Sequence, residues 1–195
     1  MEEERYYTAF VGEQIIASGP LETVLPRVKK GFDEGEVSTI LFEDQTGQQV
    51  DFELRGSVDE VLARALPARA RTGPGRPKLG VVSREVSLLP RHWAWLEQQR
   101  NGASAALRRL VDEARKQDPG RQRARLAMDA ANRFMSAMAG NLPGYEEACR
   151  ALYAADREHF EDRIRNWPHD IRAHVQRIAE AAFSAEVHPA DNVTH

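Results

Sequence analysis

A proline- and glycine-rich segment, ALPARARTGPGRPKLG at residues 65–80, limits what this chain can fold into more than any other feature. Its prolines and glycines interrupt both the helical and the strand period, and every charged residue in it is basic. Such a stretch cannot belong to a helix or a sheet. We therefore predict a basic linker over residues 67–80, which divides the 195-residue chain.

Charge is unevenly distributed around this linker. Residues 1–66 hold 6 Lys and Arg against 14 Asp and Glu (net −8), and residues 67–126 hold 14 against 5 (net +9). Residues 127–195 hold 7 against 11 (net −4), so the whole chain carries only −3. A basic centre can attract phosphate groups, and it can equally pair with acidic surfaces of the chain itself or of a partner protein.

The first 66 residues predict a small α+β domain in the order ββαββα. Aromatic and β-branched residues favour the strands, and apolar residues at helical spacing favour a helix between two hairpins. Pro26 would remove a hydrogen bond in that helix, so we expect a kink or an early end. Ser57 and Glu60 have the spacing of a capping box, which predicts a further helix start. The expected elements lie at residues 6–11, 14–18, 20–32, 37–54 and 57–66.

Residues 118–185 are helical in pattern throughout. Four amphipathic segments are separated by GNLPG (140–144), by Asp156 as a helix cap, and by Trp167-Pro168. Four helices joined by short loops predict an α-helical bundle that forms a separate C-terminal domain. Residues 186–195 are expected to be a flexible tail.

Residues 81–117 predict one strand followed by two helices. SREVSLLP (83–90) is short and β-like, Asn101-Gly102 interrupts the helical pattern, and Ser104 is expected to cap the second helix. A lone strand and two small helices cannot bury their apolar side chains without a partner. We therefore expect a homodimer whose interface contains Val86, Leu88, Trp93, Trp95, Leu107, Leu110 and Val111.

This order, in VSLLPRHWAWLEQQRNGASAALRRLVDEARK, resembles the ribbon–helix–helix repressors. In that family two chains pair their strands into a ribbon that enters the major groove of DNA, and the helices form the dimer core. The resemblance implies DNA contacts from the strand and from the start of the second helix, at Ser83, Arg84, Ser87, Ser104 and Ala105.

GRPK (75–78) resembles the core of an AT-hook, an arm that lies in the minor groove of A·T-rich DNA. This implies a basic arm that contacts DNA through Arg71, Arg76 and Lys78. The alternative is a plain linker between domains.

The order of all these parts is similar to a bacterial family catalogued as domain of unknown function 2239. The resemblance covers nearly the whole chain and implies no activity, because none is assigned to the family. It rests on FEDQTGQQVDFELRGS, GRPKLGVVSREVSLLPRHW, RFMSAMAGNLPGYEEACRALYAADREHF and WPHDIRAHV.

No residue pattern in the sequence predicts a catalytic, metal or cofactor site. Asp170 and His174 share a helical face at i,i+4, a spacing found in metal sites and more often in capping and surface pairing. Cys149, the single cysteine, lies on an apolar stripe, which favours a buried and inert thiol. We expect no catalytic residue, no metal and no cofactor, and therefore not an enzyme.

No apolar run approaches the roughly 20 residues of a membrane span, and the acidic N-terminus does not resemble a signal peptide. We therefore predict a cytoplasmic, homodimeric protein that binds double-stranded DNA and regulates transcription. The flanking parts would sense a small-molecule effector or contact a protein partner. The alternative is a protein-interaction or scaffold module that does not bind DNA.

Overall fold

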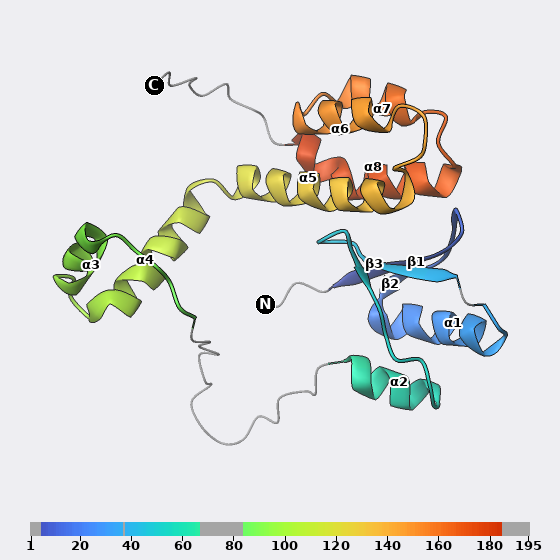
Figure 1. The fold of residues 1–195 in the computed structure, drawn as a ribbon, viewed down its shortest axis with the longest axis horizontal. Coiled ribbons are helices and arrows are strands. Elements are labelled where there is room, and N and C mark those ends of the chain that lie inside the picture. The colour runs from blue at the N-terminus through green and yellow to red at the C-terminus, as the bar shows by residue number, and fades with distance from the viewer. Residues whose placement is uncertain (1–4, 37, 67–83, 185–195) are drawn as a thin grey trace. The chain divides into compact units, whose positions relative to one another are not determined.

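The computed structural model describes residues 5–36, 38–66 and 84–184, which contain a four-stranded antiparallel sheet and eight helices (Figure 1). Residues 1–67 and 120–195 form one compact unit, here called the main unit, and residues 68–119 form a second, here called the middle unit. The fold is therefore mixed α+β and mostly helical.

The sheet of the main unit follows the predicted pattern of two hairpins. Each strand is antiparallel to its neighbours in the order β2-β1-β3-β4, so β1 and β3 are central. Gly12 and Gly47 have φ of 57° and 64° in the two hairpin connections, a conformation that glycine adopts without steric cost. The strands are β1 (Tyr6–Val11), β2 (Gln14–Pro20), β3 (Thr39–Glu43) and β4 (Gln48–Val50).

Two helices, α1 (Leu21–Asp33) and α2 (Val58–Ala65), cover one face of this sheet. Contrary to the expectation of an early end, α1 continues through Pro26 to Asp33. Its buried apolar stripe, Leu21, Val24, Leu25 and Val28, packs on the sheet and offsets the lost hydrogen bond. The predicted capping box is confirmed, because Ser57 and Glu60 bond each other's backbone N–H groups at the start of α2.

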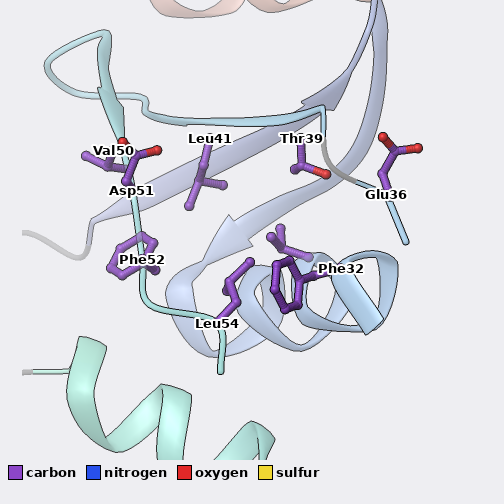
Figure 2. A pocket seen from close by; sticks show the side chains of 9 residues that line it. Phe32, Glu36, Thr39, Leu41, Val50, Asp51, Phe52 and Leu54 are labelled. Atoms are coloured by element: carbon purple, nitrogen blue, oxygen red, sulfur yellow. The ribbon is translucent and has the colours of Figure 1, made fainter. Parts of the chain in front are cut away.

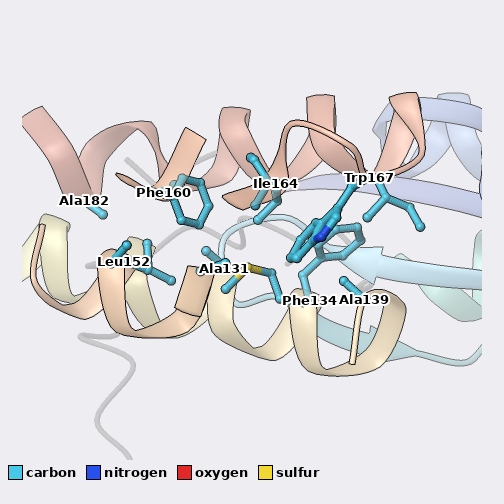
Figure 3. Close-up of a cluster of buried hydrophobic side chains, with 14 of the residues drawn as sticks. Ala131, Phe134, Ala139, Leu152, Phe160, Ile164, Trp167 and Ala182 are labelled. Carbon is cyan, nitrogen blue, oxygen red and sulfur yellow. The ribbon is translucent and has the colours of Figure 1, made fainter. Parts of the chain in front are cut away.

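The four predicted C-terminal helices are present and pack on the other face of the same sheet (Figure 1). Phe10 of β1 and Phe42 of β3 are fully buried against Phe134, with ring centroids 5.5 and 5.0 Å from it. Figure 3 shows Phe134 in this core with Leu152, Phe160 and Ile164 from the later helices and Trp167 from the connection between α7 and α8. The helices are α5 (Pro119–Met138), α6 (Tyr145–Tyr153), α7 (Arg157–Ile164) and α8 (His169–Ser184).

This arrangement differs from the predicted division into an N-terminal domain and a separate C-terminal helical domain. Successive strand residues point to opposite faces, so Tyr7 and Ala9 meet α1 whereas Phe10 meets the C-terminal helices. A sheet with two apolar faces needs a layer on each side. The first and last thirds of the chain therefore share one folded unit.

Candidate functional site

Two helices make up the described part of the middle unit, where the sequence placed dimer and DNA contacts. They are α3 (Pro90–Glu97) and α4 (Gly102–Gln117). The predicted Asn-Gly break is confirmed, because Asn101 has φ of 73° between them, a conformation that Asn tolerates. The predicted cap at Ser104 is wrong. α4 begins at Gly102, so Ser104 and Ala105 lie inside its first turns.

The residues before α3 do not form the predicted strand within one chain. Residues 84–89 are described but have neither helix nor strand structure, and the sheet of the described residues contains only β1 to β4. A ribbon of the predicted kind pairs two chains, so its formation stays a prediction. Arg84 and Ser87 lie in this segment and are exposed.

Large apolar side chains are exposed on the middle unit. Trp93 is 38% exposed, Trp95 46% and Val111 56%, whereas only Leu96 and Ala106 are buried among the described residues of this unit. So many exposed apolar side chains on so small a unit are typical of a surface that another molecule covers. We call them the apolar surface of the middle unit: Val86, Leu89, Trp93, Trp95, Leu110 and Val111. Leu88 and Leu107, also predicted at the interface, are half-buried.

Basic side chains surround these apolar residues in the sequence. Within the described part of the chain, the exposed Arg84, Arg91, Arg100 and Arg108 form no ion pair, and Arg109 pairs with Glu113 at 3.7 Å. Exposed guanidinium groups without a carboxylate partner are available to phosphates. Of the other predicted DNA-binding residues, Arg71, Arg76, Lys78 and Ser83 lie outside the described residues.

The structure also contains a polar cluster inside the main unit that the sequence analysis did not predict. Asp44 directly follows β3, and its Oδ2 accepts a hydrogen bond from Thr8 Oγ1 (3.3 Å) and forms an ion pair with Arg177 Nη1 (2.9 Å). Arg177 Nη2 donates to Thr8 Oγ1 (3.1 Å) and to His174 Nδ1 (2.9 Å). We call Thr8, Asp44, His174 and Arg177 the buried polar cluster, in which the first three side chains are buried and that of Arg177 is 49% exposed. The cluster joins β1 and the end of β3 to α8.

The protonation of His174 follows from this geometry. A guanidinium group only donates hydrogen bonds, so Nδ1 of His174 is an acceptor and the ring proton is on Nε2. Nε2 faces Asp44 Oδ1 at 3.7 Å, and neither atom has a hydrogen-bond partner among the described residues. Burial, with Arg177 beside the ring, lowers the pKa of His174 to about 3. The imidazole is therefore neutral at pH 7.

The buried polar cluster has the composition of a catalytic site but not its contacts. A nucleophile needs a base within hydrogen-bond reach, and His174 Nε2 has no such hydroxyl or thiol among the described residues. The hydroxyl of Thr8, the one hydroxyl in this cluster, bonds Asp44 and Arg177 instead. The cluster therefore holds α8 against the sheet. His174 is buried rather than on the surface with Asp170, which accepts from the backbone N–H of Ile15 (2.8 Å).

The remaining candidates are the thiol of Cys149 and a metal site. Cys149 is half-buried in α6, and burial raises the pKa of its thiol, which disfavours the reactive thiolate. In residues 5–36, 38–66 and 84–184, no three His, Cys, Asp or Glu side chains are grouped as a metal site requires. Among the helices in those ranges, none has the length and apolar character needed to cross a membrane.

Comparison with known proteins gives one match. A bacterial family described as an uncharacterized protein conserved in bacteria, DUF2239, matches residues 6–179. No curated protein and no solved structure matches the chain.

Proposed function

We propose that this chain, which belongs to the uncharacterized bacterial family DUF2239, is a homodimeric DNA-binding protein that acts through its middle unit. One observation carries the proposal: among the described residues, the middle unit leaves six large apolar side chains exposed, and arginines that form no ion pair lie close to them in the sequence. A second copy would cover the apolar surface, and the arginines would contact phosphates.

The dimer is supported by the small size of the middle unit. Leu96 and Ala106 are too few buried side chains for an independent core, since domains of this size bury a low fraction of their surface. In a two-fold dimer the same surface of each chain packs against its counterpart, so a single contact buries the apolar surface of both chains. Residues 84–89, which precede α3, would then pair with their counterparts as a ribbon.

DNA as the ligand is supported by charge. Residues 67–126 carry a net charge of +9 in a chain of −3, and Arg84, Arg91 and Arg108 are exposed without carboxylate partners among the described residues. Phosphate contacts contribute most of the affinity of nonspecific DNA binding. The alternative, an acidic protein partner, would use the same charges without salt-dependent binding to a duplex.

Assembly is tested by sedimentation of the full-length chain and of Val111→Asp. Val111 is 56% exposed, so the aspartate should not disturb the monomer, but it would place a charge in the dimer contact. We expect a dimer at micromolar concentration that dissociates in the variant. Tyr153→Asp, at a similarly exposed apolar residue (52%) of the main unit, is the matched control and should stay dimeric. A monomeric wild-type protein would refute the dimer.

DNA binding is tested by anisotropy of a labelled duplex at several salt concentrations. Each phosphate that a cation neutralises contributes about −0.9 to the slope of log K against log salt. Replacing Arg84 and Arg108 by Ala should flatten the slope by about two units, as should replacing Arg76 and Lys78 in the predicted arm. The control variant replaces Arg150 and Arg163 of the main unit. No binding to duplexes at about 50 mM salt would refute the function and favour a protein partner.

A further inference from the structure

A groove of about 240 Å³ lies on the α1 side of the sheet in the main unit (Figure 2). Phe32 of α1, Leu41 of β3, and Phe52 and Leu54 from the segment after β4 form its apolar walls. Its polar groups are the hydroxyl of Thr39 and the carboxylates of Glu36 and Asp51. Figure 2 shows Thr39 and Glu36 at one end of the groove and Val50 and Asp51 at the other.

The groove exists because the chain leaves the sheet while its side-chain alternation continues. β4 ends at Val50, yet Phe52 and Leu54 remain half-buried, whereas Asp51 and Glu53 are exposed. The apolar side chains therefore still face α1, although no strand pairing brings this segment close to β3. A space between apolar walls remains. An apolar cavity of about 150 Å³ holds a benzene molecule, so this groove has room for a ring with a short arm.

Thr39 marks one end of the groove with an unsatisfied hydroxyl. Its Oγ1 is sealed from bulk water and has no hydrogen-bond partner among the described residues. A buried hydroxyl without a partner is unfavourable, and native structures usually satisfy such groups. A rotation of the Thr39 side chain would turn the hydroxyl toward the groove, where a ligand that donates a hydrogen bond would satisfy it.

Charge selects the ligand. Glu36 accepts hydrogen bonds from the backbone N–H and the hydroxyl of Ser38, at 3.1 and 2.6 Å, and these bonds lower the pKa of Glu36 so that it is ionised at neutral pH. Among the described residues, no Lys, Arg or His lines the groove. Lys29, whose ammonium lies 5.9 Å from the Phe32 ring centroid, is paired with Asp33. The groove therefore favours a cation over an anion.

We propose that this groove binds a small organic amine, with a ring-sized apolar body between the walls and an ammonium group at Thr39 and Glu36. The ammonium would donate to Thr39 Oγ1 and to the Glu36 carboxylate, and the ring would replace water on Phe32, Leu41 and Phe52. The inference does not depend on DNA binding, because it concerns the main unit alone.

The test titrates the full-length protein with three probes of similar size: phenethylamine, 2-phenylethanol and 3-phenylpropanoate. Backbone amide chemical shifts report both affinity and location. We expect phenethylamine to bind about threefold to fivefold more tightly than the alcohol, the range of an exposed ion pair, and the carboxylate to bind most weakly. The largest shifts should be at residues that line the groove. Equal binding of all three, shifts elsewhere, or no binding would overturn the proposal.

Three variants separate the groups involved. Thr39→Val keeps the shape of the side chain and removes the hydroxyl. It should lower the affinity for phenethylamine about threefold to tenfold, and it should not lower the melting temperature of the free protein. Glu36→Gln can still accept from Ser38 and should remove only the preference for the amine over the alcohol. Glu34→Gln is the matched control, because Glu34 is exposed on α1's end and does not line the groove. Unchanged amine binding in both groove variants would refute the proposed contacts.

Discussion

Gly47→Ala should destabilise the main unit far more than Gly12→Ala, although the two glycines occupy equivalent hairpin turns. Both have left-handed φ, 64° and 57°, so alanine carries a similar backbone cost of about 1–2 kcal/mol at each position. At Gly12 an added Cβ meets no atom within 4 Å. At Gly47 it would lie 2.0 Å from the carbonyl oxygen of Ala130 in α5.

The larger loss of unfolding free energy at Gly47 follows from the movement that the added Cβ would force on the turn. The overlap is with backbone, so the β3–β4 turn has to withdraw from α5. That movement would also stretch the bond from Arg133 Nη1 to the carbonyl of Thr46, now 2.8 Å. Overpacking costs about 1–3 kcal/mol, and a lost hydrogen bond about 0.5–1.5 kcal/mol. We therefore expect about 3–6 kcal/mol for Gly47→Ala against about 1–2 kcal/mol for Gly12→Ala.

Urea unfolding measures this difference directly. Trp167 is buried in the core of the main unit, so its fluorescence reports that unit once Trp93 and Trp95 are replaced by Phe. In thermal unfolding, about 2–4 °C per kcal/mol is expected for a chain of this size. Equal losses in the two variants would mean that the turn does not contact α5. The sheet and the C-terminal helices would then be separate domains, as their sequence alone indicated.

Three further predictions concern single side chains. The folded pKa of His174 (about 3) lies below its usual value of 6.5, so the unfolded state binds more protons between these values. The free energy of unfolding should fall by up to about 1.4 kcal/mol per unit as pH drops from 6.5 to 5, and His174→Gln should remove this slope. Ser57→Ala should cost about 1 kcal/mol in urea unfolding by breaking the capping box. Cys149 should react with a thiol reagent more slowly in the folded protein than in urea, because burial disfavours its thiolate.

The order ββαββα could be predicted because its signals are local. Alternation in residues 50–54, the turn before Gln48 and the capping box at Ser57 each depend on neighbours within a few residues. α1 shows the limit of such rules. Pro26 predicted an interruption, but the burial of Val24, Leu25 and Val28 on the sheet decided the outcome. Tertiary packing outweighed a local cost of about 3 kcal/mol.

The union of the first and last thirds of the chain could not be read from local pattern, although β1 carried a hint. Ala9, Phe10 and Val11 make TAFV (residues 8–11) nearly continuous in apolar character, which is typical of a strand covered on both faces. The helices that cover the second face lie more than a hundred residues away. Phe134 meets Phe10 and Phe42 only in the folded protein, and no spacing rule connects them.

The buried polar cluster illustrates the same limit for a site. His174 lies between Ile171, Val175 and Ile178 on an apolar stripe, and a polar residue there indicates a buried partner. The side chain that bonds His174 is Arg177 of the same helix, and Asp44, whose Oδ1 lies 3.7 Å from Nε2, comes from the hairpin turn after β3. Arg177 neutralises Asp44 from the next turn of α8, so the carboxylate can be buried at all. A cluster assembled from three distant elements follows from the topology, and the topology was the part that local reasoning missed.

The middle unit presents the opposite case. Its sequence predicts apolar stripes on two helices, and the folded chain does not bury them. Trp95, Leu110 and Val111 form an apolar pattern that a single chain leaves exposed. In the main unit the apolar stripes of the C-terminal helices end in buried contacts, as at Phe134, Leu152 and Ile164. The two units therefore differ in what completes them. The main unit is completed by its own distant segments. For the middle unit we propose completion from outside the chain, by a second copy on its exposed apolar side chains and by a DNA duplex on those described arginines that form no ion pair.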